Sequence, residues 1–196
     1  MEILLLGPQG SGKGTQAKRI KATYGIPHVA TGDMIREMKE IPNELGRELK
    51  EVYDRGDLVS DELMIRLIRS RLSRGDTTPG FVLDGFPRTM VQAQALDELL
   101  REVDRDLDVV FEFQVPDRDA LLERMLKRAE EEARADDTPD AIRRRLELYD
   151  RETAPLVEYY RTRGNVVGIH ADRTIDEVFH EIEQALEDVQ RRKTPA

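Results

Sequence analysis

The sequence predicts an α/β domain built on a doubly wound parallel sheet of about five strands. Short apolar runs without alternation are typical of strands that are buried on both faces of such a sheet. These runs are residues 3–6, 81–83, 109–113 and 166–169, and residues 27–29 are a fifth candidate. Segments with helical periodicity lie between them, so strands and helices alternate along the chain.

Two of the helical segments carry an apolar stripe at helical spacing. The first stripe is Leu63, Met64, Leu67, Ile68 and Leu72, and the second is Ile175, Val178, Phe179, Ile182, Leu186 and Val189. Thr174 and Glu177 form a capping-box pattern at the start of the second helix. Thr138 followed by Pro139 predicts a further helix that begins with proline in its first turn.

Two segments fit this alternation poorly. Residues 30–59 place two charged helical stretches between strand candidates, with a break at residues 41–43, which suggests an inserted cap. The acidic residues 130–137 follow a helix that begins near Arg118, and they suggest a short excursion before the helix at Pro139. Ordinary surface helices would explain both segments about as well if no other motif were present.

Composition excludes several classes of function. The chain of 196 residues has no cysteine, so disulfides and thiolate metal sites are excluded. A formal net charge of −9 argues against general nucleic-acid binding. No apolar stretch approaches the roughly 20 residues that span a bilayer, and no targeting peptide is evident, so we expect a cytoplasmic protein. His28, His170 and His180 show no pattern of a triad or metal site, and we interpret them as structural.

Residues 7–15 form a phosphate-binding loop, or P-loop, in its proper context between a strand and the helical segment 16–24. Its glycines let successive backbone N–H groups point to one centre, and Lys13 can reach the β and γ phosphates of a nucleotide. Gly14 separates Lys13 from Thr15, so the hydroxyl that usually binds Mg²⁺ is displaced. The alternative is a glycine-rich turn that binds no ligand. The combination of strand, loop, lysine and helix argues against it.

A second motif, residues 84–89 followed by Gln92, comes directly after the strand candidate 81–83. Its position is the carboxyl end of a strand, where doubly wound folds bind ligands. The amide of Gln92 can donate one hydrogen bond and accept another at this place. A tight turn with a proline is the alternative, but it leaves Arg88 unexplained. The earlier Thr31-Gly32-Asp33 is, by itself, an ordinary helix N-cap signal.

Arginines follow at the edges of two apolar helix faces. Arg124 and Arg128 lie one turn apart beside the stripe of Leu121 and Met125. Arg145 falls beside Ile142, Leu146 and Tyr149, while Arg143 and Arg144 point away. A guanidinium in such a place needs an anion, and the spacing alone shows no carboxylate partner. Surface arginines whose stems lie along apolar groups are the alternative for each one taken singly.

With Gly-Lys-Gly-Thr in its P-loop, the chain resembles the nucleoside monophosphate kinases, and the later motifs narrow this to a short-lid adenylate kinase. The resemblance covers nearly the whole chain. It implies a core of residues 1–29, 60–126 and 138–196, an AMP-binding insertion at 30–59 and a short lid at 127–137. It also implies Mg²⁺-dependent transfer of a phosphoryl group from ATP to AMP, giving two ADP, by a monomer that binds neither nucleic acid nor membranes.

The resemblance assigns roles to individual residues. It implies that ATP is bound by Gly10, Ser11, Gly12, Lys13, Gly14, Thr15, Arg124, Arg128 and Arg173. It implies that AMP is bound by Thr31, Arg36, Asp57, Leu58, Val59, Gly85, Phe86, Pro87, Arg88, Gln92, Arg134 and Arg145. The catalytic set would be Lys13, Arg88, Arg124, Arg128, Arg134 and Arg145, with Asp84 orienting water on Mg²⁺.

The chain departs from the long-lid members of that family because only residues 129–133 separate Arg128 from Arg134. The zinc-bearing hairpin of the lid is missing, so we expect no zinc. A second departure is at residues 170–173, where the family often has an aspartate-glycine pair. Two other functions remain as alternatives. Thr31 and Gln92 argue against a UMP/CMP kinase, and the intact Lys13 and Arg88 argue against a nucleotide-binding regulator that has lost catalysis.

Overall fold

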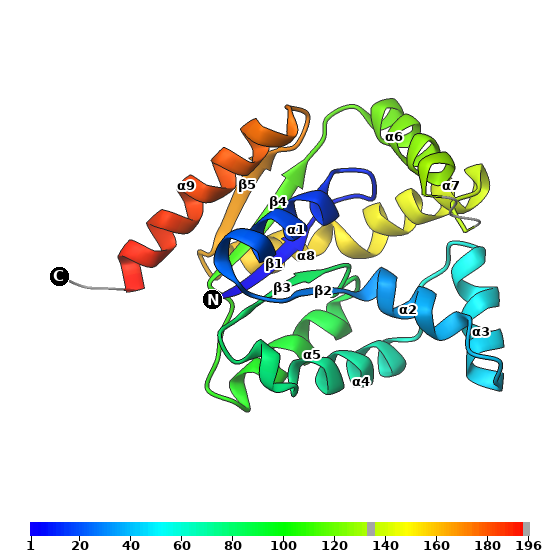
Figure 1. Ribbon diagram of the computed structural model, residues 1–196, viewed down its shortest axis with the longest axis horizontal. Coiled ribbons are helices and arrows are strands. Elements are labelled where there is room, and N and C mark those ends of the chain that lie inside the picture. The colour runs from blue at the N-terminus through cyan, green and yellow to red at the C-terminus, as the bar shows by residue number, and fades with distance from the viewer. Residues whose placement is uncertain (133–135, 194–196) are drawn as a thin grey trace.

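The computed structural model describes residues 1–132 and 136–193, and its centre is a sheet of five parallel strands (Figure 1). The strands are β1 (Glu2–Leu6), β2 (His28–Ala30), β3 (Phe81–Asp84), β4 (Val109–Gln114) and β5 (Val166–His170). Their order in the sheet is β2-β3-β1-β4-β5. The predicted α/β class and the five strand candidates are confirmed.

The apolar runs are continuous because the side chains of each central strand alternate between two hydrophobic cores. Leu4 of β1 and Leu83 of β3 belong to one core, whereas Ile3 and Val82 belong to the other. β1 pairs with β3 on one side and β4 on the other, both in parallel. The carboxyl ends of all the strands therefore meet at one edge of the sheet.

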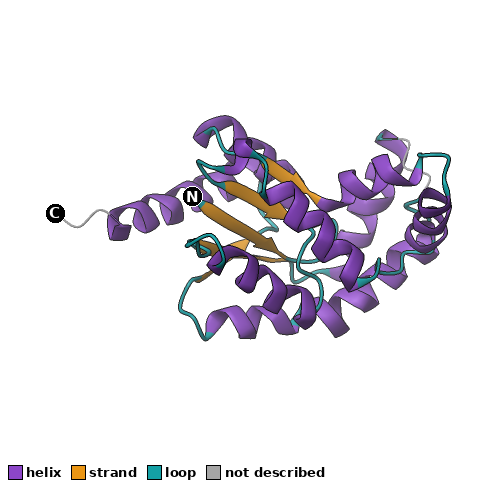
Figure 2. Cartoon of the chain, turned by 90° about the horizontal axis from the view of Figure 1, so that it is seen from below, coloured by secondary structure: helices purple, strands orange, loops and turns teal. Residues whose placement is uncertain are grey.

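Helices cover both faces of the sheet (Figure 2). One core takes its helical side chains from α1 (Lys13–Tyr24) and α9 (Ile175–Lys193). The other takes them largely from α4 (Asp61–Leu72), α5 (Met90–Arg101) and α8 (Pro155–Arg161). The predicted capping box is present, because Glu177 N donates to Thr174 Oγ1 over 3.3 Å and Glu177 Oε2 accepts from Thr174 N over 3.0 Å.

Four helices project beyond the carboxyl edge of the sheet (Figure 1). α2 (Thr31–Lys39) and α3 (Glu44–Asp54) pack on each other and flank the predicted break, and Asn43 caps α3. α6 (Arg118–Glu131) and α7 (Pro139–Leu148) lie on the other side. The predicted helix start is confirmed, since Ala141 N donates to Thr138 Oγ1 over 3.2 Å.

The short elements complete the chain. A 3₁₀ helix, η1 (Gly75–Thr77), precedes β3, and a π-helical turn, η2 (Tyr149–Thr153), joins α7 to α8. Within the described residues, no helix combines the length and the apolar character that crossing a membrane would require.

Gly56 follows α3 and lies against the first turn of α7 with φ of 80°. A Cβ at this position would come within 2.5 Å of the backbone oxygen of Ala141, so Gly56→Ala combines left-handed backbone strain with a clash. We expect it to lower the free energy of unfolding by at least about 2 kcal/mol in urea titrations. Gly75→Ala is the control, because a Cβ at Gly75 would meet no atom within 4 Å. Equal changes in both variants would contradict the prediction.

Candidate active site

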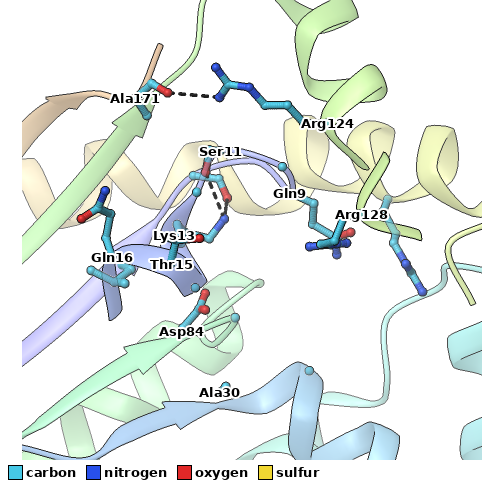
Figure 3. Close-up of a pocket in the computed structure, with 18 of the residues that line it drawn as sticks. Gln9, Ser11, Lys13, Thr15, Gln16, Ala30, Asp84, Arg124, Arg128 and Ala171 are labelled. Atoms are coloured by element: carbon cyan, nitrogen blue, oxygen red, sulfur yellow. Dashed lines mark hydrogen bonds between the residues drawn. The ribbon is translucent and has the colours of Figure 1, made fainter. Parts of the chain in front are cut away.

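A cleft of about 670 Å³ opens at the carboxyl edge of the sheet. Its walls come from segments that are far apart in the sequence. They are the P-loop, α2, the segment after β3, α6, α7 and the residues that connect β5 to α9. Figure 3 shows the side chains that converge on it from the P-loop, from β3 and from α6.

The P-loop joins β1 directly to α1, which begins at Lys13. The loop is tightly packed at Gly7, where a Cβ would lie 2.8 Å from the Cβ of Phe113. The first residues of α1, which are Lys13, Gly14 and Thr15, line the cleft. The unpaired backbone N–H groups at this end of the helix give it a positive potential. Such an arrangement binds phosphate without further side chains.

Lys13 folds back onto its own loop. Its Nζ donates to Gly7 O and Pro8 O over 2.7 Å each, and to Ser11 Oγ over 3.3 Å. Burial lowers the pKa of Lys13 to about 8, although the nearby carboxylate of Asp84 acts in the opposite direction. No carboxylate in the described part of the chain lies within ion-pair distance of this ammonium. The site thus holds a desolvated cation that is bonded directly to neutral oxygens and is stabilised at longer range by the charge of Asp84.

Asp84 ends β3 beneath Lys13 (Figure 3). Its Oδ2 lies 3.4 Å from His28 Nε2. Burial acts to raise the pKa of Asp84, but the hydrogen bond from His28 and the charges of Lys13 and Arg88 outweigh it and hold the pKa below its ordinary value. This contact of His28 was not predicted, although the pairing of β2 with β3 could have indicated it.

The carboxylate of Asp84 fits a magnesium ion that is bound together with phosphates. Mg²⁺ commonly keeps several waters and takes one or two carboxylates plus phosphate oxygens. Asp84 is ionised, faces the P-loop and lies close to Gly14, where a Cβ would be 3.6 Å from Asp84 Oδ2. A cage made of protein ligands alone is a different type of site, and no cluster of three or more histidine or acidic side chains that could form one occurs among the described residues.

Arg88 lies where the main cleft meets a smaller cavity behind it. Its Nε donates to Gly85 O over 2.8 Å, and burial lowers its pKa. Within residues 1–132 and 136–193 it forms no ion pair. The smaller cavity is lined by Thr31, Ile35, Tyr53, Asp57, Leu58, Val59, Met64, Gly85, Arg88 and Gln92. The cavity measures about 20 Å³, which is smaller than a base, so its apolar groups and amide are a wall against which a planar base attached to a phosphate at Arg88 would pack.

Arg145 is buried, as its position on the helical wheel predicted, with 7% of its surface exposed. The sequence spacing showed no carboxylate partner for it, and the structure corrects this. Arg145 donates to Asp137 and, over 3.2 Å, to Asp136 Oδ2. It also donates to Tyr53 O over 3.0 Å and lies over the Tyr53 ring. Tyr53 was not predicted, because no motif marks it.

The other arginines approach the cleft from three directions. Arg124 points towards the loop after β5 and donates to Ala171 O over 3.2 Å (Figure 3). Arg128 pairs with Asp137 over 2.6 Å, so Asp137 connects α6 to α7. Arg36 donates to Tyr53 OH over 2.8 Å and pairs with Asp33. Arg173 lines the cleft.

Every predicted site residue in the described part of the chain lines one of the two cavities, except Phe86. Phe86 is 1% exposed and packs in the hydrophobic core, so it does not line either cavity. Arg134 lies outside the described residues. Beyond the prediction, Lys39 reaches Asp54 over 2.6 Å and Asp136 over 3.5 Å, which links the segment 30–59 to the start of α7.

Comparison with known proteins agrees with this geometry. The adenylate kinase family model matches residues 5–165. The adenylate kinase of Xanthomonas euvesicatoria pv. vesicatoria (strain 85-10) is 45% identical over 186 residues, which cover 95% of this chain and 99% of that protein. The adenylate kinase of Xylella fastidiosa (strain 9a5c) is 46% identical and that of Stenotrophomonas maltophilia (strain R551-3) is 44% identical, with the same coverage. The chain therefore belongs to the adenylate kinase family.

Proposed function

We propose that the protein transfers the terminal phosphoryl group of ATP to AMP, giving two ADP in a reversible reaction that maintains the balance of adenine nucleotides. The observation that carries this is the position of Arg88. This desolvated cation, which has no ion pair in the described part of the chain, lies between a phosphate-binding loop and a small cavity that is lined by apolar groups and the amide of Gln92. Two nucleotides whose phosphates meet beside Arg88 would satisfy both halves of the cleft.

ATP would occupy the side of the P-loop. Backbone N–H groups of residues 10–15 and the ammonium of Lys13 would bind its β and γ phosphates. Lys13 would exchange its bonds to Gly7 O and Pro8 O for phosphate oxygens. Arg124 and Arg173 line the same side, where the adenosine would lie.

AMP would occupy the smaller cavity and its mouth. Arg36 and Arg88 face the region of its phosphate, and Thr31 and Gln92 line the cavity that would hold its adenine. The backbone of residues 57–59, together with Gly85 and Pro87, would complete this wall. These assignments follow the resemblance and the lining of the two cavities.

Transfer of the phosphoryl group needs positioning and neutralisation of charge more than it needs a covalent intermediate. Arg88, Arg128, Arg134 and Arg145 would surround the moving group. We propose that residues 30–59 and 127–137 close over the bound nucleotides, so that water cannot accept the phosphoryl group. Asp84 would hold a hydrated Mg²⁺, which neutralises phosphate charge when bound. The short lid would hold no zinc, and we expect a cytoplasmic monomer.

A coupled assay of ADP formation with AMP, UMP or CMP as acceptor tests this function. We expect AMP to be strongly preferred, because a site that is built to bond a particular base edge rejects others. Gln92→Leu should raise the KM for AMP at least about tenfold and leave the KM for ATP nearly unchanged. A preference for UMP or CMP would favour the pyrimidine kinase alternative, and ATP binding without any transfer would favour the regulator.

The pKa of Lys13 predicts how activity depends on pH. Because burial lowers this pKa to about 8, the free enzyme loses its phosphate-binding ammonium as the pH rises through that value. The kcat/KM for ATP should therefore fall up to about tenfold per unit above about pH 8, whereas kcat should persist to higher pH because bound phosphates favour the ammonium. Lys13→Arg is the control, since it stays charged and its profile should be flat. A wild-type kcat/KM that is constant up to about pH 10 would contradict the prediction.

Arg145 is best tested by its replacement with lysine, which keeps a positive charge beside Asp136 and Asp137. Lysine cannot provide the planar fork of a guanidinium, so kcat should fall at least about a hundredfold. Arg143→Lys is the control because Arg143 is exposed and pairs with Asp140 at the surface. Arg144 is a poorer control, since it pairs with Asp57, which belongs to the proposed AMP-binding segment. Equal and small losses of kcat in both lysine variants would remove Arg145 from the catalytic set.

A further inference from the structure

The amide of Gln92 is bonded at both ends inside the protein. Gln92 lies in the first turn of α5 and is 2% exposed. Its Oε1 accepts from the backbone N–H of Arg88 over 2.8 Å, and its Nε2 donates to Asp61 Oδ1 over 2.8 Å. The same oxygen of Asp61 accepts from Thr89 Oγ1 over 2.9 Å, which fixes the carboxylate in place.

These partners determine which way round the amide lies. A carboxylate can only accept hydrogen bonds and a backbone N–H can only donate, so neither partner can adapt to a reversed amide. Rotation by 180° would place Gln92 Oε1 against the carboxylate of Asp61 and the Gln92 NH₂ group against the N–H of Arg88. Both bonds would be lost and both new contacts would be repulsive. The orientation is therefore set by chemistry and not by the shape of the side chain.

The amide still has one N–H and one lone pair for a ligand. A primary amide carries two N–H groups and two lone pairs on its oxygen, and the protein uses one of each. Gln92 lines the smaller cavity, whereas Asp61 lies behind it and does not. The cavity thus presents one donor and one acceptor in a fixed order.

A fixed order of donor and acceptor distinguishes adenine from its 6-oxo analogue. In adenine, N1 accepts and the 6-amino group donates. In hypoxanthine, which has the same shape, N1–H donates and the 6-oxo group accepts. An amide that could rotate would pair with either base, as glutamine can by exchanging its two ends. An amide that cannot rotate pairs with adenine and not with hypoxanthine.

We propose that Asp61 is a positioning residue that locks the amide of Gln92 and thereby makes the acceptor site select AMP over 6-oxopurine monophosphates such as IMP. This rests on the proposed function, in which the base of AMP lies against Gln92. Asp61 acts through Gln92 and does not touch the substrate. Thr89 supports the lock from the N-cap of α5, where its hydroxyl also accepts from Gln92 N over 3.3 Å.

Asp61 has a structural role that must be separated from this one. It lies in the first turn of α4, where a negative charge is stabilised by the helix dipole. Glu62 lies in the same turn and is exposed, so Glu62→Gln removes the same charge from the same helix end and leaves Gln92 untouched. The variant Asp61→Asn keeps the size of the side chain and an acceptor oxygen, but its amide can itself rotate. It therefore removes one of the two fixed partners and leaves only the N–H of Arg88 to oppose a reversed Gln92.

The experiment measures kcat/KM for AMP and for IMP at saturating Mg·ATP in the wild type, Asp61→Asn, Asp61→Ala and Glu62→Gln. We expect the ratio of AMP to IMP to fall at least about tenfold in both Asp61 variants, through better use of IMP as well as weaker use of AMP. The KM for ATP should stay unchanged, and Glu62→Gln should keep the wild-type ratio. Calorimetric titration of each variant with AMP and with IMP gives the same ratio independently of turnover.

The possible outcomes distinguish the proposed role of Asp61 in fixing the Gln92 amide, called the lock below, from the proposed function on which it rests. If the wild type selects AMP and both Asp61 variants keep the same selectivity, the lock is overturned and the proposed function stands. A wild type that uses IMP as well as AMP also overturns the lock. A wild type that phosphorylates neither overturns the proposed function, and the lock with it. Equal loss of AMP and IMP activity in Asp61→Asn, with a lowered unfolding temperature, means that Asp61 is structural and overturns the lock.

Discussion

The concentration of positive charge in a desolvated cleft is the constraint on which the site depends. The chain carries a formal net charge of −9, yet Lys13 and Arg88 lie together in the cleft without an ion pair in the described part of the protein. Burial lowers the pKa of both, so each is held at a cost in stability that the two hydrophobic cores must offset. A ligand with several phosphate charges offsets that cost, so such a cleft favours polyphosphate ligands, and the base is recognised elsewhere.

The parallel sheet makes this arrangement possible because it brings the ends of distant segments to one edge. Lys13 follows β1, Asp84 ends β3, and Ala171, which accepts from Arg124, follows β5. The central strands β3, β1 and β4 each pair with a neighbour on both sides, so the loops beyond them can present polar groups from a rigid base. The helices beyond the edge then supply arginines that the sheet itself could not position.

The sequence predicted what is local and missed what depends on long-range contacts. The strands, the P-loop, the break at residues 41–43 and the burial of Arg145 all follow from periodicity or spacing within about one element. Tyr53, which contacts both Arg36 and Arg145, follows no pattern, because its role comes from the contacts of α3 with α2 and with α7. The contact of Asp61 with Gln92 joins residues 31 positions apart, and no motif marks it. Arg145 was correctly placed, but its partners Asp136 and Asp137 were not recognised as such.

The ion pairs of Asp136 and Asp137 show how Arg145 can be buried and still be available to a substrate. Removing one partner of a buried ion pair normally leaves an uncompensated charge and costs several kcal/mol. Here each carboxylate has a second cation, since Asp136 lies 3.5 Å from Lys39 and Asp137 lies 2.6 Å from Arg128. A phosphoryl group that draws Arg145 away would therefore leave Asp136 paired with Lys39, and it would leave Asp137 paired for as long as Arg128 keeps its own ion pair. Because Lys39 belongs to residues 30–59 and Asp136 to residues 127–137, the pair that remains connects the two segments that we propose close over the nucleotides.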